Sequence, residues 1–347
     1  MPADDARVAI EAGWYSCPIE HKTLKSLMQR SDRKGLADFG LWIVLLVASG
    51  YVAFLSWGSW WAIPAFLVFG TIYSSSEARA HELGHGTPFK TRWLNELFYH
   101  VCSFLTLREA YYGRWRHAIH HSHTIEVDVD PEIQVKSPAD LVRIALDFIY
   151  IPSGITELKT IARHALGLLS PATAGFVPPR EQIKMIWSSR IYLVIIAGVA
   201  MWSYAIGSFL PLMFVATPRF YGGWLHQIGG LTQHAGLREN AKDHRLNTRT
   251  VILNPAFSFL YFNLNYHVEH HLFPMVPFHA LPKLHKEIKP HLSYTYRGVF
   301  DVYREIIPAL IRQSREKDYF VYRELPVSVG NCSPPMAAGL AMACRQG

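Results

Sequence analysis

The chain has 347 residues, of which 50% are hydrophobic, and it carries a net charge of +7 with an isoelectric point of about 9.2. Length alone allows two soluble domains, but long uncharged runs favour one integral membrane domain instead. The basic balance fits the Lys and Arg excess on cytoplasmic loops of membrane proteins better than it fits nucleic-acid binding. The 4 cysteines form no C-x-x-C pair, which argues against a built-in iron–sulfur or zinc module.

The N-terminal segment, residues 1–38, is polar and shows no cleavable signal peptide. Within it, Leu24, Leu27 and Met28 share one helical face beside several Lys and Arg residues. This pattern predicts a short basic helix lying on the membrane surface, with a solvated helix of a soluble protein as the alternative.

A first uncharged run extends from Phe39 to Ser76 and is about twice the roughly 20 residues that a bilayer-spanning helix needs. Gly58-Ser59 lies near its middle and is flanked by tryptophans, as expected at a membrane interface. We therefore predict two spans, at about 39–57 and 60–78, joined by a tight turn.

A second uncharged run extends from Ile191 to Thr217 and predicts a third span at about 190–206. A turn at Gly207-Ser208 and a fourth span from about 209 to the low 230s follow. The outer turns carry no Lys or Arg, so the positive-inside rule assigns the opposite side to the cytoplasm. The intervening residues 138–190 are expected to form cytoplasmic and interfacial helices.

Three histidine clusters lie on this cytoplasmic side, with the spacings H-x-x-x-H, H-x-x-H-H and H-x-x-H-H. Their members are His81, His85, His117, His120, His121, His267, His270 and His271. Positions i, i+3 and i+4 share one face of a helix, so each cluster can direct its imidazoles at one point. Neutral imidazole is a common ligand of transition metals, and eight imidazoles exceed the about four ligands that one zinc ion takes. The count therefore fits a pair of metals.

The order of the three clusters resembles that of the membrane fatty acid desaturase and hydroxylase superfamily, over roughly Gly40 to Lys289. The resemblance is to histidine-box enzymes that hold two iron ions and use O2 as co-substrate. Together with the spans, it implies an all-α integral membrane protein with four transmembrane helices in two hairpins. A cytoplasmic helical cap would carry the histidine boxes. The membrane domain would cover residues 39–325, followed by a flexible tail at 326–347.

The resemblance also implies a ninth metal ligand from the fourth membrane helix, where two histidines are candidates. His226 and His234 are eight residues apart, which corresponds to about 12 Å along a helix. The fourth span runs toward the cytoplasm, so His234 lies closer to the other histidines. We predict His234 as the ligand, and His226 as a residue behind the ligands or in a substrate tunnel.

Metal-bound histidines usually donate their second N–H to a carboxylate or a carbonyl group. The nearest carboxylates in sequence are Glu82, Glu126, Asp128, Asp130 and Glu269. His123 is a further candidate for this supporting layer. The histidines without metal-ligand spacing are predicted to be surface or packing residues; they are His21, His100, His164, His279, His285 and His291.

The resemblance implies O2-dependent desaturation of a fatty acyl chain or a related lipid, with electrons from an external ferredoxin or cytochrome b5. The expected location is the cytoplasmic membrane in a bacterium, or the endoplasmic reticulum in a eukaryote, with the site facing the cytoplasm. Hydroxylation of a hydrocarbon, lipid or small molecule begins with the same hydrogen abstraction and is the main alternative. The stretch at residues 81–91 looks most like bacterial-type members, which include such oxygenases.

Two further classes of protein are weaker candidates. An intramembrane zinc metalloprotease is a remote alternative, because His81-Glu82-Leu83-Gly84-His85 matches H-E-x-x-H. That reading leaves six clustered histidines without a role. A metal transporter would place its polar groups near the bilayer midplane, whereas these histidines lie beyond the predicted span ends.

Overall fold

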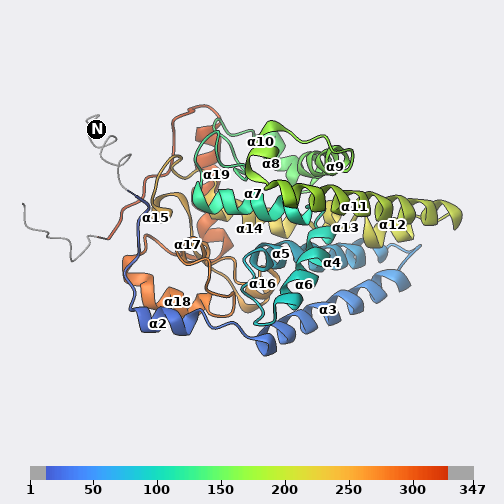
Figure 1. Cartoon of the computed structure of the whole chain (residues 1–347), viewed down its shortest axis with the longest axis horizontal. Helices are drawn as coiled ribbons and strands as arrows, with labels where there is room; N and C mark the ends of the chain where they lie inside the picture. The colour runs from blue at the N-terminus through green and yellow to red at the C-terminus, as the bar shows by residue number, and fades with distance from the viewer. Residues whose placement is uncertain (1–12, 327–347) are drawn as a thin grey trace, which may run out of the picture.

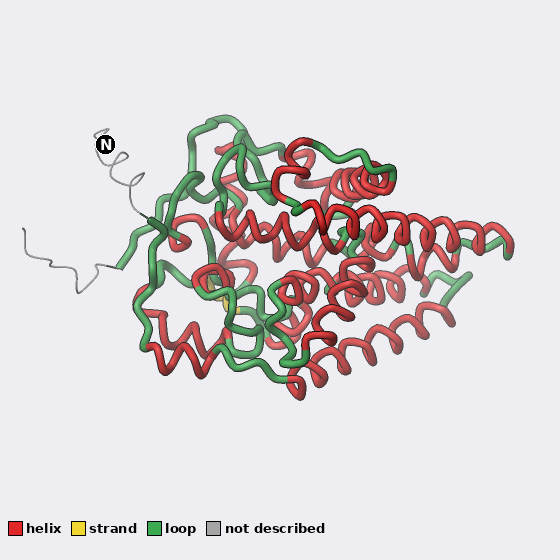
Figure 2. Tube along the Cα trace, viewed as in Figure 1, coloured by secondary structure: helices red, strands yellow, loops and turns green. Residues whose placement is uncertain are grey.

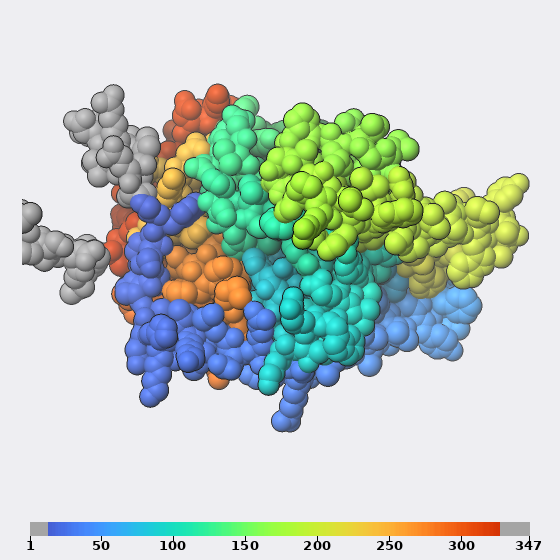
Figure 3. Space-filling model, viewed as in Figure 1, coloured from blue at the N-terminus to red at the C-terminus, as the bar shows by residue number. Residues whose placement is uncertain are grey.

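The computed structural model describes residues 13–326, and this part of the chain is mostly helical, with loops between the helices and almost no sheet (Figure 2). Long apolar helices extend toward one end of the molecule, and shorter helices joined by loops fill the other (Figure 1). The helices of residues 92–176 cover the middle of the face seen in Figure 3. The predicted tail at 326–347 lies outside the described residues, except for its first position.

The first hairpin is built from α3 (Asp32–Leu55) and α4 (Ala62–Ser74). Ser31 caps α3 by accepting a hydrogen bond from the Lys34 amide, which satisfies one of the free donors of the first turn. The helix ends before Gly58, whose φ of +83° suits a residue without a side chain. The turn predicted at Gly58-Ser59 is therefore confirmed.

The second hairpin begins with α11 (Pro179–Ala205), which starts at a proline and ends before Gly207, where φ is +60°. This confirms the predicted turn at Gly207. The apolar windows of α3 and α11 are long enough to cross a membrane and are only 17% and 28% buried. A core helix of a soluble protein would be mostly buried, so these two helices have the exposure of helices that contact lipid.

The second predicted span, at about 60–78, is not one continuous helix, because the chain is interrupted at Ser75. α5 (Ser76–Gly84) follows directly. The hydroxyls of Ser75 and Ser76 each donate to a carbonyl three residues earlier, at 2.6 Å, and such bonds compete with the helical pattern.

The fourth predicted span is also divided, into α12 (Leu210–Val215), α13 (Pro218–Gly222) and α14 (Trp224–His234). Pro218 has no amide hydrogen to continue the preceding helix, and Gly222-Gly223 gives a second weak point. The membrane-spanning role of these pieces and of α4 remains a prediction.

The two hairpins meet through backbone contact between α4 and α13. A Cβ atom on Gly222 would lie 1.9 Å from the carbonyl carbon of Gly70, and a Cβ on Gly70 would lie 2.3 Å from the Tyr221 ring. Only glycine permits this approach. The contact fixes α14, which follows α13, against the end of α4 that leads into α5.

Arg79 anchors α5 to the first hairpin. Its side chain is fully buried, pairs with Asp38 at 2.9 Å and lies among the rings of Phe39, Trp42 and Phe262. A buried guanidinium is costly without a charged partner and close aromatic faces. This arrangement orients the helix that carries the first histidine cluster.

The helix predicted near the N-terminus is α2 (His21–Leu27). The prediction that its apolar face lies on the membrane surface is wrong. Leu24 and Leu27 pack against α18 (Leu281–Ile288), in a cluster with Leu281 and Leu284. α18 therefore buries the face of Leu24 and Leu27 that we assigned to the membrane.

The remaining helices are mostly short and surround the histidine clusters. They are α6 (Arg92–Leu105), α7 (Ala110–Ser122), α8 (Leu141–Asp147), α9 (Ile151–Ala165), α10 (Pro171–Phe176), α15 (His244–Asn247), α16 (Pro255–Leu260), α17 (His267–Leu272), the 3-10 helix Lys289–His291 and α19 (Val299–Gln313). Two short strands, β1 (Val251–Ile252) and β2 (Tyr296–Arg297), pair in parallel and tie the chain before α17 to the start of α19.

The topology can be tested with reporter proteins fused after Ser59 and at the C-terminus. We expect the two fusions to report opposite sides of the membrane, because both hairpins return the chain to its starting side. Two reporters are needed: one that is active only in the cytoplasm and one that is active only on the opposite side of the membrane. Together they measure the side of each fusion directly. Two fusions on the same side would contradict the four-span topology.

Candidate metal centre

Four helices bring nine histidines into one buried site. α5 contributes His81 and precedes His85, α7 and α17 contribute three histidines each, and α14 ends with His234. Eight of these side chains form two groups in which the candidate ligand nitrogens lie within 4.8 Å of one another. The groups are His81, His117, His121 and His270, and His120, His234, His267 and His271.

The distances within the groups are those of ligands that share an ion. In the first group, the Nε2 atom of His117 lies 3.0 Å from that of His121, and the Nε2 atoms of His121 and His270 are 3.1 Å apart. In the second, the His267 Nε2 lies 3.1 Å from that of His234 and 3.2 Å from that of His271. Nitrogens about 2.1 Å from a common metal are separated by such distances when their bonds meet at about 90–100°.

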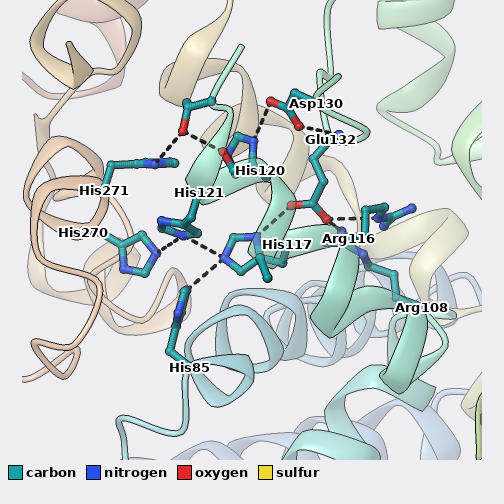
Figure 4. A network of polar contacts seen from close by, with 12 residues as sticks. His85, Arg108, Arg116, His117, His120, His121, Asp130, Glu132, His270 and His271 are labelled. Atoms are coloured by element: carbon teal, nitrogen blue, oxygen red, sulfur yellow. Dashed lines mark hydrogen bonds and ion pairs between the residues drawn. The ribbon is translucent and has the colours of Figure 1, made fainter. Parts of the chain in front are cut away.

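His85 lies beside the first group, with its Nε2 atom 3.0 Å from that of His117 (Figure 4). It is not one of the four nitrogens that lie within mutual reach. The geometry therefore gives the first group four close donors and a fifth imidazole at its edge.

The protonation state of three histidines is fixed by acceptors behind them. The Nδ1 atoms of His117 and His120 lie 2.8 Å from the carboxylates of Glu132 and Asp130, as Figure 4 shows. The Nδ1 of His234 lies 2.8 Å from the carbonyl oxygen of Asn247. An acceptor at Nδ1 requires the hydrogen on that atom, so each Nε2 keeps a lone pair directed at the centre of the site.

Asp130 is held in place by the backbone that surrounds it. Its carboxylate accepts hydrogen bonds from the amides of Ile125 and Glu132, at 2.9 and 2.8 Å. The loop after α7 therefore folds around Asp130 and directs it at His120. Asp130 and His120 are both buried, which strengthens the hydrogen bond between them.

Glu132 links the metal centre to two arginines. Its carboxylate pairs with Arg108 and, at 3.0 Å, with Arg116 (Figure 4). Burial alone would raise the pKa of Glu132, but the charge of Arg108 and the contact with His117 hold it well below its usual range. The residue is therefore a permanent anion that can accept the His117 hydrogen.

Glu82 lies behind the third cluster, with Oε1 2.8 Å from the His270 Nδ1, although the angle is not that of a hydrogen bond. Both side chains are fully buried, and Thr87 donates to the carboxylate at 3.0 Å. Glu82 therefore supports the site from within the protein core. It is poorly placed for the water-activating role that a zinc protease would require.

Burial sets the charge of the imidazoles. It lowers the pKa of His117 to about 4 and lowers the pKa of His121 and His267 well below the usual value, with neighbouring histidines adding to the effect for the latter two. These side chains are therefore neutral at pH 7. Neutral imidazole is the form that binds metals.

His226 lies apart from the two groups, with Nε2 3.1 Å from Glu77, and lines a cavity beside them, which is compatible with the predicted tunnel position. Other predicted supporting residues lie elsewhere. His123 is partly exposed and pairs with Glu126, while Asp128 is exposed. Asp130 and Glu82 are at the centre, as predicted.

The contacts of three further residues around the centre were not predicted. Nothing in the spacing of Glu132 indicated which histidine it would contact. His285, assigned to the surface or to packing, is buried and contacts Glu269 at 2.5 Å. His244 stacks between Trp14 and His271, with ring centroids 4.4 and 4.9 Å away. These contacts join distant segments, so only the fold could reveal them.

The chain combines a helical fold, two apolar helices of membrane-spanning length and two groups of histidines that could hold metal ions. A sequence model of fatty acid desaturases matches residues 58–303, and the chain belongs to this family. Its members are membrane-bound oxidoreductases that act on lipids, as the chain's own relatives illustrate.

Three relatives are each similar to about three quarters of the chain. The probable fatty acid desaturase DES1 of Sorghum bicolor is 25% identical and aligns over 73% of this chain and 69% of its own length. The sn-1 acyl-lipid omega-3 desaturase (ferredoxin) of Synechocystis is 25% identical over 73% of this chain and 74% of its own. The human sphingolipid delta(4)-desaturase/C4-monooxygenase DES2 is 24% identical over 77% of each chain.

The role of Asp130 can be tested by replacing it with asparagine. We expect Asp130→Asn to weaken metal binding by about 10–100-fold, because an amide no longer enforces the His120 tautomer. Metal content after dialysis against graded chelator measures this loss. Asp128→Asn, an exposed change in the same loop, is the matched control and should leave metal binding intact. Equal binding in both variants would contradict the assigned role.

Proposed function

We propose that this protein is an O2-dependent di-iron oxidoreductase that desaturates a fatty acyl chain or a related lipid. The observation that carries the proposal is the convergence of imidazole lone pairs in two groups at ligand-to-ligand distances. Imidazole donors with no thiolate suit iron among the metals with redox chemistry, and two groups suit two ions. The names of the relatives support lipid desaturation as the reaction.

Nine histidines would hold the two ions. They are His81, His85, His117, His120, His121, His234, His267, His270 and His271. Bound iron would supply the redox chemistry that activates O2. The protein keeps these imidazoles neutral by burial, fixes tautomers through Glu132, Asp130 and the Asn247 carbonyl, and holds the ligands on short, packed helices.

The overall reaction fixes what must reach the site. Desaturation converts –CH2–CH2–, O2, two electrons and two protons to –CH=CH– and two waters. Hydroxylation uses the same O2, electrons and protons, but leaves R–OH and one water. It is the second candidate reaction, because the human relative carries both activities in its name.

The two electrons require a separate one-electron carrier, for which a ferredoxin or a cytochrome b5 is the proposed class. The Synechocystis relative names ferredoxin as its donor. A chain with a net charge of +7 and its Lys and Arg concentrated on the proposed cytoplasmic side favours an acidic carrier.

The ligand set can be tested by comparing two histidines of α14. His234→Ala should lose iron and turnover together, because His234 supplies one of four close nitrogens in the second group. His226→Ala is the matched control and should keep two irons per chain, because His226 contacts Glu77 outside both groups. Iron is measured by elemental mass spectrometry. Two irons and normal turnover in His234→Ala would refute His234 as the ninth ligand. Full activity with zinc as the only bound metal would refute the proposed di-iron oxidoreductase.

The carrier interaction predicts a dependence on salt. With the carrier limiting, turnover should fall as the Debye length shrinks from about 10 Å at 0.1 M to about 3 Å at 1 M salt. Iron reduction by dithionite serves as the control and should change little. Carrier-dependent turnover that is the same at both salt concentrations would exclude electrostatic docking.

A further inference from the structure

A polar cavity of about 270 Å³ opens beside both histidine groups. It reaches His81 of the first group and His120 and His234 of the second. Gly230 contributes to this space, because a Cβ there would lie 2.9 Å from the Gln134 side-chain oxygen. The position makes the cavity a direct approach to the proposed reaction centre.

The lining of this cavity is dominated by charged and hydrogen-bonding side chains. They include Glu77, Arg108, Arg116, Glu132, Gln134 and Gln227, besides the three histidines. The apolar side chains are those of Pro131, Ile133, Tyr150 and Leu264. A run of methylene groups would displace water from these polar groups without replacing its hydrogen bonds, which is costly.

The charges of the lining are already paired with one another. Arg108 pairs with Glu77 at 3.2 Å and with Glu132, and Arg116 pairs with Glu132 at 3.0 Å and with Glu157 at 2.9 Å. A charged ligand would have to separate one of these pairs, at a cost that its own interactions must exceed. An uncharged polar group would leave them intact.

Hydrogen-bonding groups remain available beside these ion pairs. Nε of Arg219 and Nδ1 of His226 are buried without a partner among the described residues. Gln134 donates to Gln227 at 2.7 Å, which leaves the other amide positions of both residues for a ligand. This mixture of donors and acceptors matches hydroxyl or amide groups.

The mouth of the cavity lies at the exposed surface of α8 and α9. Gln134, Arg143 and Thr156 of the lining are exposed. The same helices expose apolar side chains nearby, including Val142 at 70% and Ile155 at 45%. Exposed apolar residues beside charged ones are typical of helices at the level of lipid head groups. Polar molecules can therefore enter without crossing the membrane core.

We propose that this cavity binds an uncharged polar group of the substrate, bearing hydroxyls or amides, and that the oxidised C–H bond adjoins that group. The inference rests on the proposed O2-dependent oxidoreductase and moves its site of oxidation from the acyl chain to carbons beside a polar group. The group belongs either to a lipid head or to a free, compact polar molecule, since both present the same chemistry at an interfacial mouth. This cavity does not bind the middle of a long acyl chain.

The test locates the site of oxidation in the product. Cells that produce the wild-type protein are compared with cells that produce the inactive His120→Ala variant, by mass spectrometry of aqueous and lipid extracts. Tandem fragmentation then places the new double bond or hydroxyl. A change on carbons that adjoin a hydroxyl or amide is expected, with the aqueous extract indicating a free molecule and the lipid extract a lipid head.

A change in the middle of an acyl chain would overturn the cavity assignment and leave the proposed oxidoreductase intact. No change in either extract, from protein that contains two irons, would contradict the proposed function and the assignment together. These outcomes separate the failure of one proposal from the failure of the other.

Two variants test the cavity itself. Gln227→Leu, at the buried wall, and Thr156→Trp, at the exposed mouth, should each lower product yield at least tenfold with two irons retained. Thr156 lies on the surface, so that variant is expected to fold even if Gln227→Leu does not. Gln29→Leu is the control, because Gln29 is exposed, follows α2 and does not line the cavity. This variant should keep the wild-type product yield. Unchanged yield in Thr156→Trp and in folded Gln227→Leu would overturn the proposal.

Discussion

Repulsion between closely spaced imidazole nitrogens governs how the site is built. Where Nδ1 of His117 and of His234 faces an acceptor, Nε2 carries the lone pair and lies 3.0 and 3.1 Å from the Nε2 of a neighbouring histidine. Two buried lone pairs at such distances repel one another unless a hydrogen or a cation lies between the nitrogens. The acceptors therefore prepare the site for metal, and their replacement should affect metal affinity more than folding.

The scaffold must hold that repulsive arrangement before any ion binds. Arg79 fixes α5 to the first hairpin, and the glycine contact between Gly70 and Gly222 fixes the second hairpin beside it. The loop around Asp130 fixes the acceptor behind α7. Arg79, Gly70, Gly222 and Asp130 are all buried, so these contacts hold the ligands in position beside the polar cavity.

The sequence could predict the residues of the site because helical spacing is local information. The clusters at His117–His121 and His267–His271 face one point for the same reason that any i, i+3, i+4 set does. The two outer turns were predictable from glycine in uncharged runs. The partners Glu132, His244 and His285 were not, since each meets its neighbour through tertiary packing. The broken helices around Ser75 and Pro218 were missed because hydropathy is insensitive to local hydrogen bonding.

The proposed function depends on two all-imidazole groups that each hold one iron. X-ray absorption at the iron edge of the purified protein tests this directly, because it reports the element and its nearest atoms. We expect two irons per chain, with nearest neighbours that are mostly nitrogen at about 2.1 Å and with the more distant scattering pattern of imidazole rings. A sulfur-containing shell, or a protein that is active with zinc and no iron, would contradict it.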